Sequence, residues 1–168
     1  SAKEGIRIYI GERGDKAIRK YNKFIPKQDE GYFLRISPKE IVLAGNDEQG
    51  TFYAVQTLKQ LLNYNQLPIT EITDYPEVRF RGVVEGFYGT PWSHQARLRH
   101  LKFYGENKMN TYIYGPKDDP YHSSPNWRLP YPEKEAKQIK ELVQVAKENA
   151  VNFVWAIHPG QDIKWNQE

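Results

Sequence analysis

The stretch Gly82-Val-Val-Glu-Gly-Phe-Tyr-Gly-Thr-Pro-Trp92 indicates the fold of this chain. It starts as a short β-branched strand and breaks at glycine into a loop of aromatic, charged and hydroxyl side chains. Two later segments repeat the pattern, Thr111-Tyr-Ile-Tyr-Gly-Pro-Lys-Asp-Asp-Pro120 and Asn152-Phe-Val-Trp-Ala-Ile-His-Pro-Gly160. Helical patterns that start near Ser93 and at Pro132 separate the three strands. Because strands that alternate with helices form parallel sheets with right-handed crossovers, the second half of the chain is predicted to be an α/β unit.

The first part of the chain, residues 1–75, is predicted to be a small α+β domain. Its alternating apolar runs indicate strands at residues 6–10, 32–36 and 41–44. Asn46 with Gln49 resembles a capping box that would start a helix. The helix is expected to carry one apolar face, made of Phe52, Val55, Leu58, Leu61 and Leu62. No catalytic cluster stands out in this part, so an accessory, structural role is expected.

Chain length restricts what the second part can be. A complete eight-fold βα barrel needs about 250 residues, whereas residues 76–168 hold three strand patterns. The residues alone leave two possibilities, a small open sheet or the front part of a barrel.

Composition excludes several classes of function. The formal net charge of +3 is small, and the 24 basic and 21 acidic residues are interspersed, so neither nucleic acid nor an anionic membrane is an expected partner. The chain has no cysteine, which excludes thiol nucleophiles and Cys-ligated zinc. Aromatic residues make up 14% of the chain, and this mildly favours a glycan ligand because aromatic rings stack on sugar faces.

The ends of the three strands hold the candidate functional residues, because ligands of parallel α/β folds bind at the carboxyl ends of strands. Gly86 could let a ligand approach the backbone or could simply permit a turn. Lys117 could donate hydrogen bonds to hydroxyls or could be a solvated surface residue. Asp118 and Asp119 could form an acid–base pair, but residues of this kind before a proline are more often turn formers.

Other titratable residues near the strand ends are expected to be structural. Glu85 ends a buried strand and should pair with an arginine such as Arg81 or Arg79. His158 is expected to be a hydrogen-bonded residue at a strand end, and His94 and His100 are expected on the surface of the first helix. Neither a Gly-rich phosphate loop nor a Gly-x-Ser-x-Gly elbow is present in the sequence.

Three segments together resemble glycoside hydrolase family 84, the β-N-acetylglucosaminidases that include bacterial O-GlcNAc hydrolases, also described as hyaluronoglucosaminidases. They are residues 83–92, residues 110–119 and Trp155-Ala-Ile-His-Pro-Gly-Gln-Asp-Ile163. The resemblance implies an α/β fold class: a small N-terminal α+β domain of hexosaminidase type (residues 1–75), followed by the first three βα units of an incomplete (β/α)8 TIM barrel (residues 76–168).

The resemblance also implies a mechanism and a set of site residues. The family hydrolyses with retention, because the 2-acetamido oxygen of the substrate itself attacks the anomeric carbon, an exception to the two-carboxylate scheme. Its adjacent pair of aspartates follows the fourth barrel strand and is expected beyond Glu168, so no catalytic residue is assigned here. Gly86, Tyr88 and Lys117 match residues that bind or line the sugar site, and Asp118 and Asp119 are expected to support the loop that carries Lys117. Neither a cofactor nor a metal is expected.

These implications define the expected function. The parent enzyme would remove terminal GlcNAc from glycoconjugates or glycoproteins, and the 168-residue chain would be inactive by itself. The alternatives are a non-catalytic glycan-binding or interaction module and a fragment of a related hexosaminidase family. The edge and inner face of an incomplete barrel would promote self-association, and a secreted or periplasmic location is expected.

Overall fold

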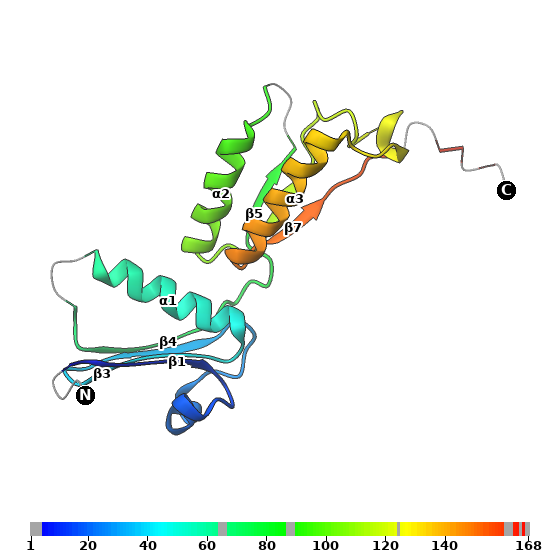
Figure 1. Ribbon diagram of the computed structural model, residues 1–168. Coiled ribbons are helices and arrows are strands. Elements are labelled where there is room, and N and C mark those ends of the chain that lie inside the picture. The colour runs from blue at the N-terminus through cyan, green and yellow to red at the C-terminus, as the bar shows by residue number, and fades with distance from the viewer. Residues whose placement is uncertain are drawn as a thin grey trace. The chain divides into compact units, whose positions relative to one another are not determined.

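The computed structural model describes residues 5–63, 67–86, 90–123, 125–159, 163–164 and 166. The chain forms two compact units, Ser1–Arg79 and Phe80–Glu168 (Figure 1). No helix among the described residues is long and apolar enough to cross a membrane.

The first unit is a four-stranded sheet with one helix on each face (Figure 1). Its strands β1 (Arg7–Glu12), β2 (Tyr32–Ile36), β3 (Glu40–Gly45) and β4 (Thr70–Asp74) lie in the order β1-β3-β2-β4. β1 is parallel to β3, and the other pairs are antiparallel. The turn between β2 and β3 is closed by a hydrogen bond from Ser37 N–H to Glu40 O of 2.9 Å.

The 3-10 helix η1 (Lys16–Phe24) and the helix α1 (Glu48–Leu62) close the two faces of this sheet. The cap of α1 differs from the prediction: Asp47, not Asn46, accepts the hydrogen bond from Gly50 N–H at 2.7 Å. The face of α1 also differs, because its buried residues are Gly50, Tyr53, Ala54, Gln56 and Thr57. The reason is a close backbone contact, since a Cβ at Gly50 would lie 2.1 Å from Gly31 O. A glycine at this position therefore lets α1 approach the backbone of Gly31.

The second unit is a three-stranded sheet covered by two helices. Its strands β5 (Gly82–Glu85), β6 (Thr111–Tyr114) and β7 (Asn152–Trp155) are parallel and neighbour one another in chain order, which confirms the predicted alternation of strands and helices. The crossovers contain α2 (His94–Glu106), the short 3-10 helix η2 (Asn126–Arg128) and α3 (Glu133–Glu148). Ser93 caps α2 by accepting a hydrogen bond from Ala96 N–H, and α3 begins one residue after Pro132.

The two faces of this second sheet have different surroundings. The helix-covered face buries a core that includes Leu101, Tyr112, Tyr114, Leu142 and Ala146. The opposite face presents one apolar row across all three strands, in which Val84 is paired with Ile113 and Ile113 with Val154. Val84 and Val154 are exposed and Ile113 is half-buried, so this face has little cover from the described residues. We call it the open face.

Candidate functional site

The predicted site residues follow neighbouring strands at one edge of the second sheet. Gly86 comes directly after β5, and Lys117 comes three residues after β6. The strand pairing continues past the strand ends, with Gly115 N–H donating to Glu85 O at 3.0 Å and Ala156 N–H to Tyr114 O at 2.8 Å. Since the three strands are parallel, their carboxyl ends meet at this edge. Tyr88, the third residue predicted to line the sugar site, lies outside the described residues.

Gly86 leaves open space on the open face. A Cβ built on Gly86 would find Val84 Cγ1 at 3.4 Å and Gly115 O at 4.0 Å as its nearest neighbours. Gly86 is also absent from the described residues with positive φ, so the turn itself does not require a glycine there. The missing side chain therefore gives a ligand access to the backbone rather than relieving a strained conformation.

Lys117 lies in a tight turn and is half-buried. The turn is closed by a hydrogen bond from Asp119 N–H to Pro116 O of 3.0 Å. Among the described residues, the Lys117 ammonium has no hydrogen bond or ion pair. A lysine whose ammonium has no partner among the described residues keeps its three donors available to a ligand.

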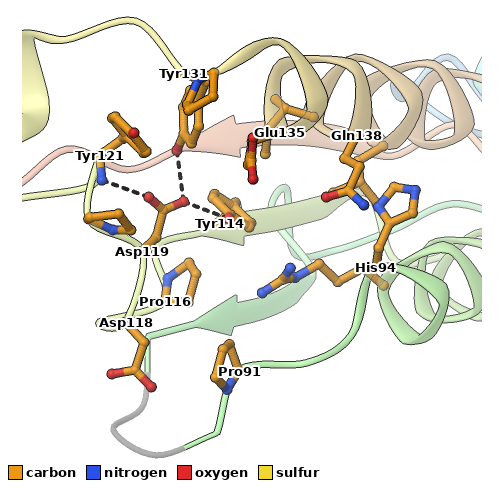
Figure 2. Close-up of a pocket in the computed structure, with 15 residues that line it drawn as sticks. Pro91, His94, Tyr114, Pro116, Asp118, Asp119, Tyr121, Tyr131, Glu135 and Gln138 are labelled. Atoms are coloured by element: carbon orange, nitrogen blue, oxygen red, sulfur yellow. Dashed lines mark hydrogen bonds between the residues drawn. The ribbon is translucent and has the colours of Figure 1, made fainter.

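Asp119 fixes this turn to the rest of the unit. Its Oδ2 accepts hydrogen bonds from Tyr114 O–H at 2.6 Å and from Tyr131 O–H at 2.8 Å, and its Oδ1 accepts one from Tyr121 N–H at 2.8 Å (Figure 2). Burial raises the pKa of both tyrosine hydroxyls, and their hydrogen bonds to Asp119 raise the pKa further. Trp155 of β7 extends the network through a 2.9 Å hydrogen bond from its Nε1 to the Tyr131 hydroxyl.

Asp118 has different surroundings, although it precedes Asp119 in the chain. Its side chain is exposed, and Figure 2 shows its carboxylate directed away from that of Asp119. The two carboxylates therefore do not converge on a common point, as an acid–base pair would have to do.

Glu85 forms the expected ion pair, but with a different arginine. Arg97 of α2 holds the buried carboxylate through Nε, at 2.9 and 3.2 Å, and through Nη2, at 2.6 Å, and the Tyr112 hydroxyl also donates to it. The prediction of Arg81 or Arg79 was wrong. Successive residues of a strand point to opposite faces of the sheet, so Val84 lies on the open face and Glu85 faces the helices, where Arg97 lies. The Arg81 side chain instead donates to Lys108 O at 3.0 Å.

This pair is a structural element of the sheet–helix interface. Burial lowers the pKa of the Arg97 guanidinium, but the hydrogen bonds and charge of Glu85 outweigh burial and leave the pKa raised. Burial and the hydrogen bond to Glu85 raise the pKa of the Tyr112 hydroxyl. The raised pKa values keep the Arg97 guanidinium charged and the Tyr112 hydroxyl neutral near neutral pH, so both remain hydrogen-bond donors to Glu85.

Comparison with known proteins identifies the family. The sequence profile described as beta-N-acetylglucosaminidase matches residues 81–168, which is just over half of the chain. The chain belongs to this β-N-acetylglucosaminidase family, glycoside hydrolase family 84. The profile of glycosyl hydrolase family 20, domain 2, matches residues 2–75.

Individual relatives of this family 84 chain agree with that assignment. Protein O-GlcNAcase of Rattus norvegicus is 42% identical over 85 residues, covering 51% of this chain and 9% of the relative. The structure of CpGH84B is 55% identical, covers 84% of this chain and 25% of that one, and gives a TM-score of 0.79. The structure of CpGH84D is 32% identical over 99% of this chain and 30% of that one, with a TM-score of 0.82. The chain therefore spans less than a third of the length of these relatives.

The family 84 chain also has a cavity of about 360 Å³ on the helix-covered side of the second sheet (Figure 2). Arg97, Tyr114, Asp119, Tyr131 and Leu142 are among the residues that line it. Gly86 and Lys117 do not line this cavity, and the strand alternation places Gly86 on the open face instead. Gly86 and Lys117 are thus separate from this cavity. Among the described residues, no group of three or more His, Cys, Asp or Glu could hold a metal ion.

The two histidines of α2 lie deeper than predicted. His94 and His100 were expected on the surface, but both are partly buried: His94 Nε2 lies 2.7 Å from Glu141 Oε2 of α3, and the His100 ring contacts the Trp92 ring edge-on at 4.4 Å. His158 is hydrogen-bonded at its strand end as predicted, through its N–H to His122 O at 2.8 Å.

His122 was missed by the sequence analysis. It is buried, and its Nδ1 lies 2.7 Å from Ala156 O, directly after β7. Its position in a polar loop between two prolines gives no hydrophobic period or motif that would have indicated burial.

Proposed function

We propose that this chain is the amino-terminal part of a longer β-N-acetylglucosaminidase, an O-GlcNAc hydrolase that removes terminal GlcNAc from glycoconjugates. The observation that carries the proposal is the placement of Gly86 and Lys117 after neighbouring parallel strands, at one edge of the sheet. Family membership and the identity to Protein O-GlcNAcase support the substrate class.

The architecture proposed for the parent is a (β/α)8 TIM barrel that begins near residue 76. In such barrels the inner face of the sheet is packed with branched apolar residues from every strand. The row of Val84, Ile113 and Val154 on the open face has this composition and is largely exposed. The outer edges of β5 and β7 also have no neighbouring strand among the described residues. Both features support a sheet whose remaining strands are supplied by further sequence.

The proposed roles of the site residues follow from their surroundings. The backbone carbonyl of Gly86 and the ammonium of Lys117 would contact sugar hydroxyls, since the first is approachable and the second has no partner among the described residues. Asp119 would hold the turn that carries Lys117 through its three hydrogen bonds. Tyr88 would line the pocket, and Asp118 would support the same loop.

The chemistry proposed for the parent is substrate-assisted hydrolysis with retention. One aspartate would polarise the acetamido group, and its neighbour would protonate the leaving oxygen and later activate water. In this proposal that pair follows the fourth strand, beyond residue 168. Asp119 cannot stand in for it, because its carboxylate already accepts three hydrogen bonds within the loop.

An assay of residues 1–168 tests the proposal. We expect no hydrolysis of an aryl N-acetylglucosaminide, because general acid–base catalysis, worth about 10²–10⁴-fold, and acetamido polarisation would both be missing. Hydrolysis above the buffer blank that disappears in Asp118→Ala would make the Asp118–Asp119 pair catalytic and refute the proposal.

Two other functions remain distinguishable by experiment. A glycan-binding module would bind N-acetylglucosamine with a saturating micromolar isotherm, whereas half of an enzyme pocket should not saturate at millimolar ligand. The other alternative is a related hexosaminidase, and the observation behind it is the match of residues 2–75 to the family 20, domain 2, profile. A related hexosaminidase would have an Asp-Glu pair after the fourth strand of the parent, whereas a family 84 enzyme would have an Asp-Asp pair. The sequence of the parent therefore distinguishes the two enzymes.

A further inference from the structure

The loop that carries Lys117 is attached to the sheet at two points. We call residues 116–123 the Lys117 loop. Asp119 attaches it on the helix-covered side, through Tyr114 and Tyr131. His122 attaches it to the end of β7, through Ala156 O. We propose that His122 is a positioning residue, whose Nδ1–H holds the Lys117 loop against β7 and thereby places the Lys117 ammonium for the sugar; this inference rests on the proposed function.

The geometry defines the state of the imidazole. His122 is 4% exposed, and its Nδ1 lies 2.7 Å from Ala156 O. A carbonyl oxygen only accepts hydrogen bonds, so Nδ1 must carry the hydrogen, and the neutral ring then has an unprotonated Nε2. Nε2 is buried and has no hydrogen-bond partner among the described residues. A single side-chain hydrogen bond, from Nδ1, therefore orients the ring.

The ring also fills a defined place at the carboxyl edge of the sheet. A Cβ on Gly115 would lie 3.0 Å from His122 Cε1 and 3.1 Å from Ala156 Cβ. Tyr114 faces the helices, and the next residue of the chain points to the opposite face of the sheet. A Cβ on Gly115 would therefore point to the open face, where Gly86 is accessible. The imidazole thus rests on the ends of β6 and β7 beside the proposed sugar site.

The backbone around His122 continues this attachment. His122 O accepts a hydrogen bond from His158 N–H at 2.8 Å, and Ser123 forms a parallel bridge with His158. His122 N–H in turn donates to Asp119 O at 3.2 Å. The Lys117 side chain has no partner of its own among the described residues, so its position depends on the backbone of this loop.

Steady-state kinetics of the full-length enzyme that contains this chain test the inference. His122→Phe keeps a ring of similar size but removes the donor. We expect it to raise KM for an aryl N-acetylglucosaminide about tenfold, the equivalent of about 1.4 kcal/mol, with kcat changed less than about threefold. His122→Asn, whose amide N–H can donate near the position of Nδ1, should keep KM within about threefold of wild type.

A matched control separates positioning from a loss of stability. Asn152 begins β7 at the opposite end of the strand, where its Nδ2 donates to Asn110 O at 3.0 Å. Asn152→Ala also removes one hydrogen bond to a main-chain carbonyl, but it should leave KM unchanged. If it raises KM as much as His122→Phe does, the effect is one of general destabilisation and the inference is wrong.

A double-mutant cycle with Lys117→Ala shows whether His122 acts through Lys117. In the Lys117→Ala background, His122→Phe should no longer raise KM. An equal rise in both backgrounds, or an Asn variant as defective as Phe, overturns the inference. An inactive wild-type parent would instead refute the proposed function.

Nuclear magnetic resonance of the 168-residue chain tests the geometry independently of activity. The imidazole ¹⁵N shifts of His122 should show a protonated Nδ1 and an unprotonated Nε2. The backbone amide of Lys117 should shift in His122→Phe and not in Asn152→Ala. The other tautomer, or an unchanged Lys117 amide, would overturn the inference even if His122→Phe proved too unstable for kinetics.

Discussion

Replacing Arg97 by methionine should destabilise the second unit strongly. Glu85 is 0% exposed and the Arg97 side chain is 12% exposed, so the pair is almost fully shielded from water. Arg97→Met removes all three nitrogen–oxygen contacts of 2.6–3.2 Å and leaves the Glu85 carboxylate with the Tyr112 hydroxyl. Breaking a buried ion pair in this way costs about 3–5 kcal/mol, a large share of the 5–15 kcal/mol that stabilises an ordinary domain.

Tryptophan fluorescence during urea denaturation measures this loss in the right part of the molecule. All four tryptophans, Trp92, Trp127, Trp155 and Trp165, belong to the second unit. The control is Lys137→Met, which breaks an exposed pair with Glu133 (74% and 84% exposed) and should cost at most about 1 kcal/mol.

A double variant tests the physical reason for the loss. Glu85→Gln combined with Arg97→Met removes the unpaired charge and leaves an amide oxygen that can still accept from Tyr112. We expect it to be at least about 1.5 kcal/mol more stable than Arg97→Met alone, because the desolvated carboxylate is the main penalty. A loss below 1 kcal/mol in Arg97→Met, or a double variant no more stable than the single one, would refute the reasoning.

Three further predictions concern other parts of the chain. Gly82→Ala should destabilise the second unit by more than about 3 kcal/mol, because its Cβ would lie 1.6 Å from Thr111 O. Gly86→Ala should cost less than about 1 kcal/mol, because its Cβ would meet no atom closer than 3.4 Å. Urea denaturation of the two variants measures the difference. The hydrogen bond from Tyr21 lowers the pKa of Glu40 in the folded state below its unfolded value of about 4.3. This hydrogen bond therefore stabilises the fold at pH values above the unfolded pKa, and that stability is lost as the pH falls through the lower folded pKa. The difference in melting temperature between wild type and Tyr21→Phe should therefore shrink from pH 7 to pH 3, and a constant difference would contradict this linkage. The open face should cause self-association that rises with concentration and weakens in Val154→Lys; light scattering of a wild-type monomer at high concentration would rule this out.

The sequence was sufficient for the order of elements in the second unit. Three strand patterns that break at glycine, separated by helical periods, determine a parallel sheet and the edge at which Gly86 and Lys117 lie. These features depend on short-range patterns, and so they can be read without coordinates.

What the sequence could not predict depends on the angular setting of a helix or on a distant partner. The buried face of α1 was predicted wrongly because hydropathy does not show that Gly50 meets the backbone of Gly31, a residue distant in sequence. The partner of Glu85 was predicted wrongly for a similar reason, since only the packing of α2 shows that Arg97 faces the strand. The apolar residues Ile8 and Ile10 of β1 remain exposed, although the alternation of that strand is regular.

The anchoring of Asp119 and Tyr131 to one another has a consequence for protein engineering. The hydrogen bond between the two side chains closes the segment between them, so replacing residues 125–129 by a foreign peptide is expected to leave the turn that carries Lys117 in place. A dye-bearing graft that left this hydrogen bond intact would report on the approach of a macromolecule to this edge of the sheet without altering the turn that carries Lys117.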